Sequence, residues 1–326
     1  MAPGQDSRPA RHGAPVRAGS LSTCADCVTS SSSSPPPGGA AARSRTDRIC
    51  MTTAGKGSVR ESNSSEGMPV PAWELSEGHG PVIATAVHNG HDLRPEVGAL
   101  IALDGAQRLH EEDPYTGGWT EVGDTSVVVT RSRFEMDLNR SRGLAIYLEP
   151  EHAWGLRVWR EQPPEDVVER SLAQYDAFYR LMRDVLTRAE RAFGGFVVFD
   201  LHTYNHLREG ADRPADKAGN PDINVGTGTM PRERWARLVE RFMAEFADQD
   251  VQGEQLDVRE NVRFRGGFFP RWVHETFPQS GCALAIEVKK TFMDEHTGEL
   301  DQARWAAIGQ ALEATVPGVR EQLAQR

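Results

Sequence analysis

Two histidines come directly after runs of apolar residues. His88 follows the run 82–87, and His202 closes a run that begins at Gly195. Short apolar runs of this kind predict buried parallel strands, and open α/β sheets carry their chemistry at the carboxyl ends of such strands. Neutral imidazole is the commonest protein ligand of zinc. Each histidine alone would more often cap its strand by hydrogen bonding, but two together predict a metal site.

A catalytic zinc ion takes three protein ligands and leaves one position open, so a third ligand is needed. His91 is one candidate, three residues after His88. Glu112 and Asp113 are carboxylate candidates in an acidic run that continues into Pro-Tyr-Thr-Gly-Gly-Trp. Consecutive acids are more often a solvated turn, yet this continuation is unusual for an ordinary loop. We favour the acidic segment and keep His91 as the alternative.

Two further acids lie on predicted strands. Glu287 interrupts the apolar run 283–289, and a buried carboxylate is costly unless it is paired or ligated. It is therefore a candidate general base beside the metal, although Lys289, two residues on, offers a structural ion pair. Asp200 precedes His202 by two residues and faces the same side of its strand, where it can orient a histidine.

An arginine cluster follows the second predicted strand. Four arginines fall within twelve residues beside Asn139, at Arg131, Arg133, Arg140 and Arg142. A guanidinium pairs a carboxylate through two parallel hydrogen bonds, so the cluster predicts an anion site. Glu135 and Asp137 in the same segment offer a purely structural pairing, which carries equal weight.

Composition bounds the class of protein. The chain has 326 residues and a formal net charge of −10. Phosphate contacts need clustered Lys and Arg, so we expect no nucleic-acid partner. No stretch approaches the ~18 consecutive apolar residues of a membrane span, and the start has no apolar secretory segment. We therefore expect a cytoplasmic protein that does not bind a membrane.

The organisation along the chain predicts one folded unit. Residues 1–68 are rich in Ser, Pro, Gly and Ala, a composition that predicts a disordered tail, and residues 69–326 predict a single domain. Alternating strands and helices favour a mostly parallel mixed sheet with helices on both faces. A long polar loop is expected over 203–230, with another strand and a loop over the site within 255–272. We expect strands at 81–87, 126–132, 143–148, 195–201 and 283–289, and helices at 165–193, 231–248 and 301–324.

Together these segments resemble the N-formylglutamate amidohydrolase family, a branch of the zinc-dependent carboxypeptidase and aspartoacylase superfamily. The resemblance covers about residues 80–300. It rests on the motifs at residues 86–91, 112–117, 132–140, 200–204 and 287–290, with 293–298.

The resemblance implies a role for most of the residues above. It implies a zinc-exopeptidase-like fold with one zinc ion per chain, held by His88 and His202. Asn139 and Arg140 would grip the substrate carboxylate, and Glu287 would activate water. The chain departs from carboxypeptidases at the second ligand, because they have His-x-x-Glu where this chain has His91. The candidates for that ligand remain His91, Glu112 and Asp113.

The expected activity is hydrolysis of a small N-acyl amino acid. Arg133 would polarise the acyl carbonyl, while Tyr204, which follows His202 and a hydroxyl residue, is assigned to the substrate. The alternative is a carboxylate-binding or docking protein that keeps the fold without a catalytic metal, and the missing His-x-x-Glu is its support. A peptidase acting on longer chains is a third interpretation.

Overall fold

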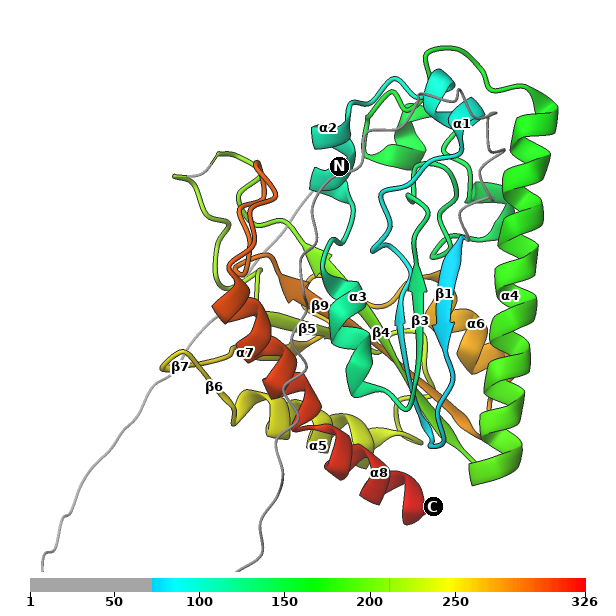
Figure 1. The fold of residues 1–326 in the computed structure, drawn as a ribbon. Coiled ribbons are helices and arrows are strands. Elements are labelled where there is room, and N and C mark those ends of the chain that lie inside the picture. The colour runs from blue at the N-terminus through cyan, green and yellow to red at the C-terminus, as the bar shows by residue number, and fades with distance from the viewer. Residues whose placement is uncertain (1–71, 211) are drawn as a thin grey trace, which may run out of the picture. The chain divides into compact units, whose positions relative to one another are not determined.

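The computed structural model describes residues 72–210 and 212–326. The predicted disordered tail, residues 1–68, lies outside the described residues. The described chain forms a seven-stranded mixed sheet in the order β1-β3-β2-β4-β9-β5-β8 (Figure 1). The strands are β1 (Trp73–Ser76), β2 (Val82–Ala86), β3 (Thr125–Val129), β4 (Phe196–Tyr204), β5 (Ile223–Gly226), β8 (Val258–Glu260) and β9 (Gly281–Lys289), with a separate hairpin of β6 (Asp250–Val251) and β7 (Glu254–Gln255).

The four strands β3, β2, β4 and β9 are parallel, whereas β1 pairs antiparallel with β3 and β5 pairs antiparallel with β9. The predicted mostly parallel mixed sheet is therefore confirmed. Parallel strands end at the same edge of the sheet, so the residues after β2, β4 and β9 gather there.

Helices cover both faces of the sheet (Figure 1). The α-helices are α1 (Pro95–Leu100), α2 (Gly105–Glu111), α3 (Thr116–Trp119), α4 (Glu165–Phe193), α5 (Ala236–Ala247), α6 (Phe268–Thr276), α7 (Gln302–Glu313) and α8 (Val316–Ala324). The short 3₁₀ turns are η1 (Thr120–Val122), η2 (Arg142–Leu144) and η3 (Pro150–Ala153). Helices α4 and α6 pack on one face, while α3, α5, α7 and α8 pack on the other.

The central strand β4 explains the two-sided architecture. All nine of its residues are buried, because successive side chains of a strand point to opposite faces and both faces are covered. Phe196 and Val198 join the core beneath α4 and α6. Val197 and Phe199 join the core beneath α5, α7 and α8. A strand buried on both faces is held rigidly, which suits it to position a site at its end.

Three sequence predictions about elements were wrong. Residues 143–148 form no strand; they lie in η2 and the loop after it, where Ala145 and Tyr147 are buried because this loop packs into the core. Residues 301–324 divide into α7 and α8, with Pro317 in the first turn of α8. The loop 203–230 is interrupted by the end of β4 and by β5. An apolar run in the sequence therefore did not distinguish a strand from a buried loop, and the length of a predicted segment did not show where it is divided.

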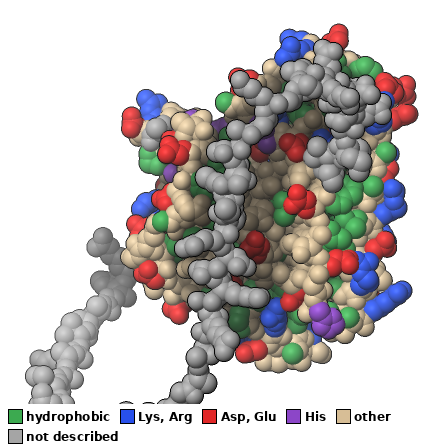
Figure 2. All heavy atoms as spheres, viewed as in Figure 1, with side chains coloured by type: hydrophobic (Ala, Val, Ile, Leu, Met, Phe, Trp, Pro, Cys, Tyr) green, Lys and Arg blue, Asp and Glu red, His purple; other side chains and the backbone are tan. Residues whose placement is uncertain are grey.

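The surface carries charges of both signs. Acidic and basic side chains are interspersed over the face shown in Figure 2. Among the described residues, no helix is both long enough and apolar enough to cross a bilayer.

Candidate metal centre and active site

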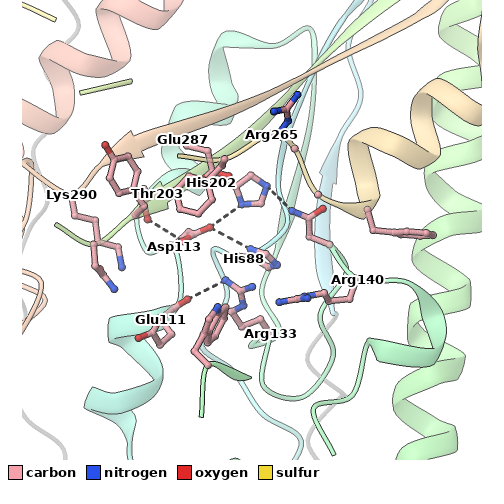
Figure 3. A pocket seen from close by; sticks show the side chains of 18 of the residues that line it. His88, Glu111, Asp113, Arg133, Arg140, His202, Thr203, Arg265, Glu287 and Lys290 are labelled. Atoms are coloured by element: carbon pink, nitrogen blue, oxygen red, sulfur yellow. Dashed lines mark hydrogen bonds and ion pairs between the residues drawn. The ribbon is translucent and has the colours of Figure 1, made fainter. Parts of the chain in front are cut away.

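Two buried histidines and one buried aspartate meet at the edge of the sheet (Figure 3). His88 follows β2, His202 lies near the end of β4, and Asp113 follows α2. The Asp113 Oδ2 atom is 3.4 Å from His88 Nδ1 and 3.0 Å from His202 Nδ1. The two imidazole centroids are 4.9 Å apart. One ligand atom from each residue therefore faces a common point.

The other nitrogen of each imidazole is held by a second buried aspartate. His88 Nε2 lies 2.8 Å from Asp137 Oδ1, and His202 Nε2 lies 3.0 Å from Asp200 Oδ2. Thr85 Oγ1 in turn donates to Asp200 Oδ1. A carboxylate on the outer nitrogen favours a proton there, so Nδ1 is the atom that would give its lone pair to a bound ion. These contacts orient both histidines as ligands.

The charges at the centre support one another. Burial raises the pKa of Asp113, but the neighbouring His202 and His88 side chains hold it well below its usual range. Burial disfavours the charged form of His202, yet the neighbouring Asp200 raises its pKa well above the usual value. The pKa of Asp137 is likewise held low, against its burial, by His88 and Arg133. The carboxylates of Asp113 and Asp137 are therefore ionised at neutral pH.

The three residues fit a divalent metal such as zinc. His88 Nδ1 is buried and has no hydrogen-bond partner among the described residues, which is the state expected of an atom that binds an ion. In a tetrahedral site with bonds of about 2 Å, neighbouring ligand atoms are about 3.3 Å apart, close to the two distances above. Two imidazoles and a carboxylate are also a donor set of catalytic zinc sites.

Backbone and side-chain contacts bring Asp113 to this point. Its N–H donates to the carbonyl of His88 over 2.9 Å. Thr203 Oγ1 donates to Asp113 Oδ1 over 3.1 Å. Lys290 Nζ donates to the carbonyls of His110 and Glu112, both over 2.8 Å. The acidic segment is thus tied to β2, to β4 and to the end of β9.

The other two candidate ligands contact each other instead. His91 Nδ1 pairs with Glu112 Oε2, and Glu112 also accepts from Ser132 Oγ. The Glu112 side chain is fully buried, whereas that of His91 is 42% exposed. The structure does not bring either residue to the histidine pair. Consecutive residues of the acidic segment project in different directions, and Asp113 is the one that faces His88 and His202.

Glu287 lies opposite His202 in the β4–β9 register and lines the same cavity. Burial raises its pKa to about 7, against the opposing effect of His202. Lys289 pairs with Asp222 at 2.7 Å, so the ion pair with Glu287 that the sequence left open does not form. Glu287 is thus a carboxylate whose protonation changes near neutral pH.

The structure divides the predicted arginine cluster. Arg142 pairs with Asp176 and Arg131 with Glu135, which are structural contacts. Arg133 reaches the centre, because its Nη2 donates to Asp137 Oδ2 over 2.9 Å. Burial opposes its charge, but Tyr147 and Asp137 raise the pKa of Arg133 above its usual value.

The three predicted substrate-side residues all line a cavity of about 460 Å³. The Arg140 side chain is 40% exposed, and its ion pair with Asp137 is long, at 3.9 Å. Asn139 Oδ1 accepts from the N–H of Phe269 over 2.9 Å. Tyr204 is less free, because its hydroxyl donates to the carbonyl of Pro221. Arg140 therefore has the most capacity for a ligand.

Sequence reasoning missed four Lys and Arg residues of this cavity. Arg208, Arg265, Arg271 and Lys290 line it, and Arg208 is paired with Glu111. The irregular stretch 255–272 was expected to form a strand and a loop over the site, and β8 and the loop before α6 do so. The glycines at 266 and 267 could have indicated that this loop approaches the site. Gly267 lies so close to the Asn139 side chain that a Cβ atom would not fit.

Comparison with known proteins gave a family match and structural neighbours. The family model described as N-formylglutamate amidohydrolase matches residues 80–293. No curated protein matches the chain. An N-formylglutamate amidohydrolase from Ralstonia eutropha has a similar structure, with 16% identity, a TM-score of 0.63, and 78% of this chain and 99% of that chain covered. A gene product from Agrobacterium tumefaciens has 17% identity, a TM-score of 0.55, and coverage of 78% and 96%. At these identities the two structures support the fold alone.

Proposed function

Because the chain belongs to the N-formylglutamate amidohydrolase family, we propose that it hydrolyses the amide bond of an N-acyl amino acid. His88, Asp113 and His202 would hold one zinc ion. The observation that carries the proposal is this buried triad, which shares a cavity with Glu287 and Arg140.

The cavity supports a substrate with a free α-carboxylate. Arg140 is held loosely by the protein and offers a planar fork for a carboxylate, with Asn139 beside it. Arg265 and Arg271 line the same cavity and make no ion pair with another described residue. The N–H groups of Phe268 and Phe269 contact Asn139, so the loop that carries these arginines is joined to the Asn139 end. Uncompensated arginines there favour a second carboxylate on the amino acid.

The proposed chemistry uses residues already described. A bound zinc ion would lower the pKa of a water molecule and polarise the amide carbonyl. Glu287 takes the proton of the attacking water and delivers it to the leaving amine, and a pKa near neutrality suits both transfers. Arg133 stabilises the negative charge that develops on the carbonyl oxygen. Arg140 fixes the α-carboxylate, which places the amide bond beside Glu287.

Metal analysis combined with a substrate screen tests the proposal. We expect about one equivalent of zinc per chain, and hydrolysis of N-formyl-, N-acetyl- or N-succinyl-L-glutamate that stops on chelation and returns with zinc. His88→Ala should lose the metal, whereas His91→Ala, three residues away, should retain it. Full activity after complete metal removal, or no cleavage of any N-acyl amino acid by the zinc-loaded protein, would refute the proposal.

A further inference from the structure

A buried lysine lines the cavity away from Arg140. Lys290 follows β9 and is only 2% exposed, yet it belongs to the cavity wall. In Figure 3, Lys290 and Arg140 lie on opposite sides of His88 and His202. The cavity therefore has a basic group at each end and the candidate metal centre between them.

Lys290 has unused capacity to bind an anion. Its Nζ donates to the backbone carbonyls of His110 and Glu112, and an ammonium group has three N–H donors. It forms no ion pair with any carboxylate of the described residues. One N–H donor of Lys290 is therefore left without a partner, and its charge is not directly paired with a carboxylate.

The carboxylates near Lys290 are committed to other groups. Glu111 binds Arg208 through two hydrogen bonds of 2.7 Å. Glu295 accepts the backbone N–H groups of His206 and Leu207.

The third nearby carboxylate, Asp113, faces the two histidines. A buried cation without its own counter-ion is costly, and burial lowers the pKa of Lys290 to about 8. An anionic ligand at this end of the cavity would remove that cost.

We propose that Lys290 binds a carboxylate at the far end of the acyl group, so that the preferred substrates are amides of a dicarboxylic acid. This inference rests on the proposed function. If Arg140 holds the α-carboxylate and the amide bond lies beside Glu287, the acyl group extends towards Lys290. A formyl group is a single carbon and cannot reach it, whereas a succinyl group presents a carboxylate.

Competing kcat/KM measurements on three substrates test the inference. N-succinyl-, N-acetyl- and N-formyl-L-glutamate differ only in the acyl group. We expect the zinc-loaded protein to favour the succinyl over the acetyl substrate by roughly tenfold or more, the usual worth of a charge-assisted hydrogen bond. Lys290→Met should abolish that preference, and Lys290→Arg should restore part of it. Lys289→Met is the matched control, because this neighbouring lysine pairs with Asp222, and it should leave the preference intact.

The outcomes separate this inference from the proposed function. Hydrolysis of the formyl or acetyl substrate without a preference for succinyl overturns the role of Lys290 and leaves the hydrolase proposal standing. Failure to cleave any of the three overturns both. Zinc content of Lys290→Met is measured in parallel, since Lys290 also contacts the segment that carries Asp113. Equal losses on all substrates together with lost zinc would show that Lys290 only positions that segment, against the inference.

Discussion

The candidate metal centre and the arginine end of the cavity differ in how completely the protein satisfies its own polar groups. At the metal centre, the outer nitrogens of His88 and His202 are paired with buried aspartates. At the arginine end, Arg265 and Arg271 have no ion-pair partner among the described residues. Arg140 is 40% exposed and 3.9 Å from its nearest carboxylate. The protein itself supplies the hydrogen-bond partners of the two histidines. The arginines have no such partners within the protein, so a substrate carboxylate can pair with them.

This difference matches the different tasks that we propose for the two regions. A metal ligand set has to be held in place before the ion binds, and buried hydrogen bonds do this. A substrate clamp has to exchange its ligand in every cycle, so its charges remain accessible to solvent. Variants at the candidate metal centre should therefore alter chemistry and metal affinity, whereas variants at the arginine end should alter substrate binding.

The largest effect is expected at Glu287. Glu287→Gln keeps the shape but cannot accept a proton, so kcat should fall by roughly 10²- to 10⁴-fold while zinc remains bound. Steady-state kinetics and metal analysis of the same preparation measure both. Glu260→Gln is the control, since Glu260 pairs with Arg232 and does not line the cavity. A variant that keeps wild-type kcat would remove Glu287 from the mechanism.

A smaller effect is expected where Asp200 orients His202. An amide at this position can still accept from Thr85, but its NH₂ group would then face the His202 Nε2–H. The imidazole would then carry its proton on Nδ1, which could no longer give a lone pair to zinc. Asp200→Asn should therefore weaken zinc binding by roughly 10- to 100-fold. Competition with a chromogenic chelator measures the affinity. Asp222→Asn is the control, because Asp222 pairs with Lys289, and this variant should bind zinc normally. Equal zinc affinity in the two variants would contradict the orienting role of Asp200.

The arginine end should respond through KM. Arg140→Met removes the proposed α-carboxylate contact, so KM should rise by about tenfold for substrates with a free carboxylate. The corresponding methyl esters should show little change between the wild type and the variant. Arg142→Met, which removes only the surface pair with Asp176, is the control. If the acid and its ester respond equally, Arg140 is not the clamp.

The smallest expected effect concerns the stability of the helix that carries Arg271. His274 in α6 accepts the N–H of Ala283 in β9, and burial lowers its pKa to about 4. Because this value is below the ~6.5 of an unfolded histidine, the unfolded chain binds more protons between these pH values. The stabilising contribution is complete above pH ~6.5 and is lost as the pH falls towards 4.

Lowering the pH from 7 to 5.5 should therefore cost about 1 kcal/mol of unfolding free energy through His274. Urea titrations at the two pH values measure the change. His274→Gln, whose carbonyl can still accept from Ala283, should show a decrease smaller by that amount. An identical pH dependence in both proteins would assign the acid sensitivity to other groups.

The sequence alone determined the class of fold and the elements that carry the chemistry. Apolar runs that end in a histidine indicate buried parallel strands, and both β2 and β4 are such strands. Glu287 could be singled out because a carboxylate inside an apolar run is unusual. The family resemblance was also visible in the order of the motifs, and the family match over residues 80–293 confirms it.

Only the tertiary structure decided which acid meets the histidines and which cations remain unpaired. Sequence spacing does not give the direction of a side chain in an irregular segment. Asp113 faces the histidines because its backbone N–H is hydrogen-bonded to His88, and because Lys290 is hydrogen-bonded to the carbonyls of His110 and Glu112 in the same segment. Lys290 itself could not be singled out, since its burial and its lack of a carboxylate partner arise from contacts between segments far apart in the chain.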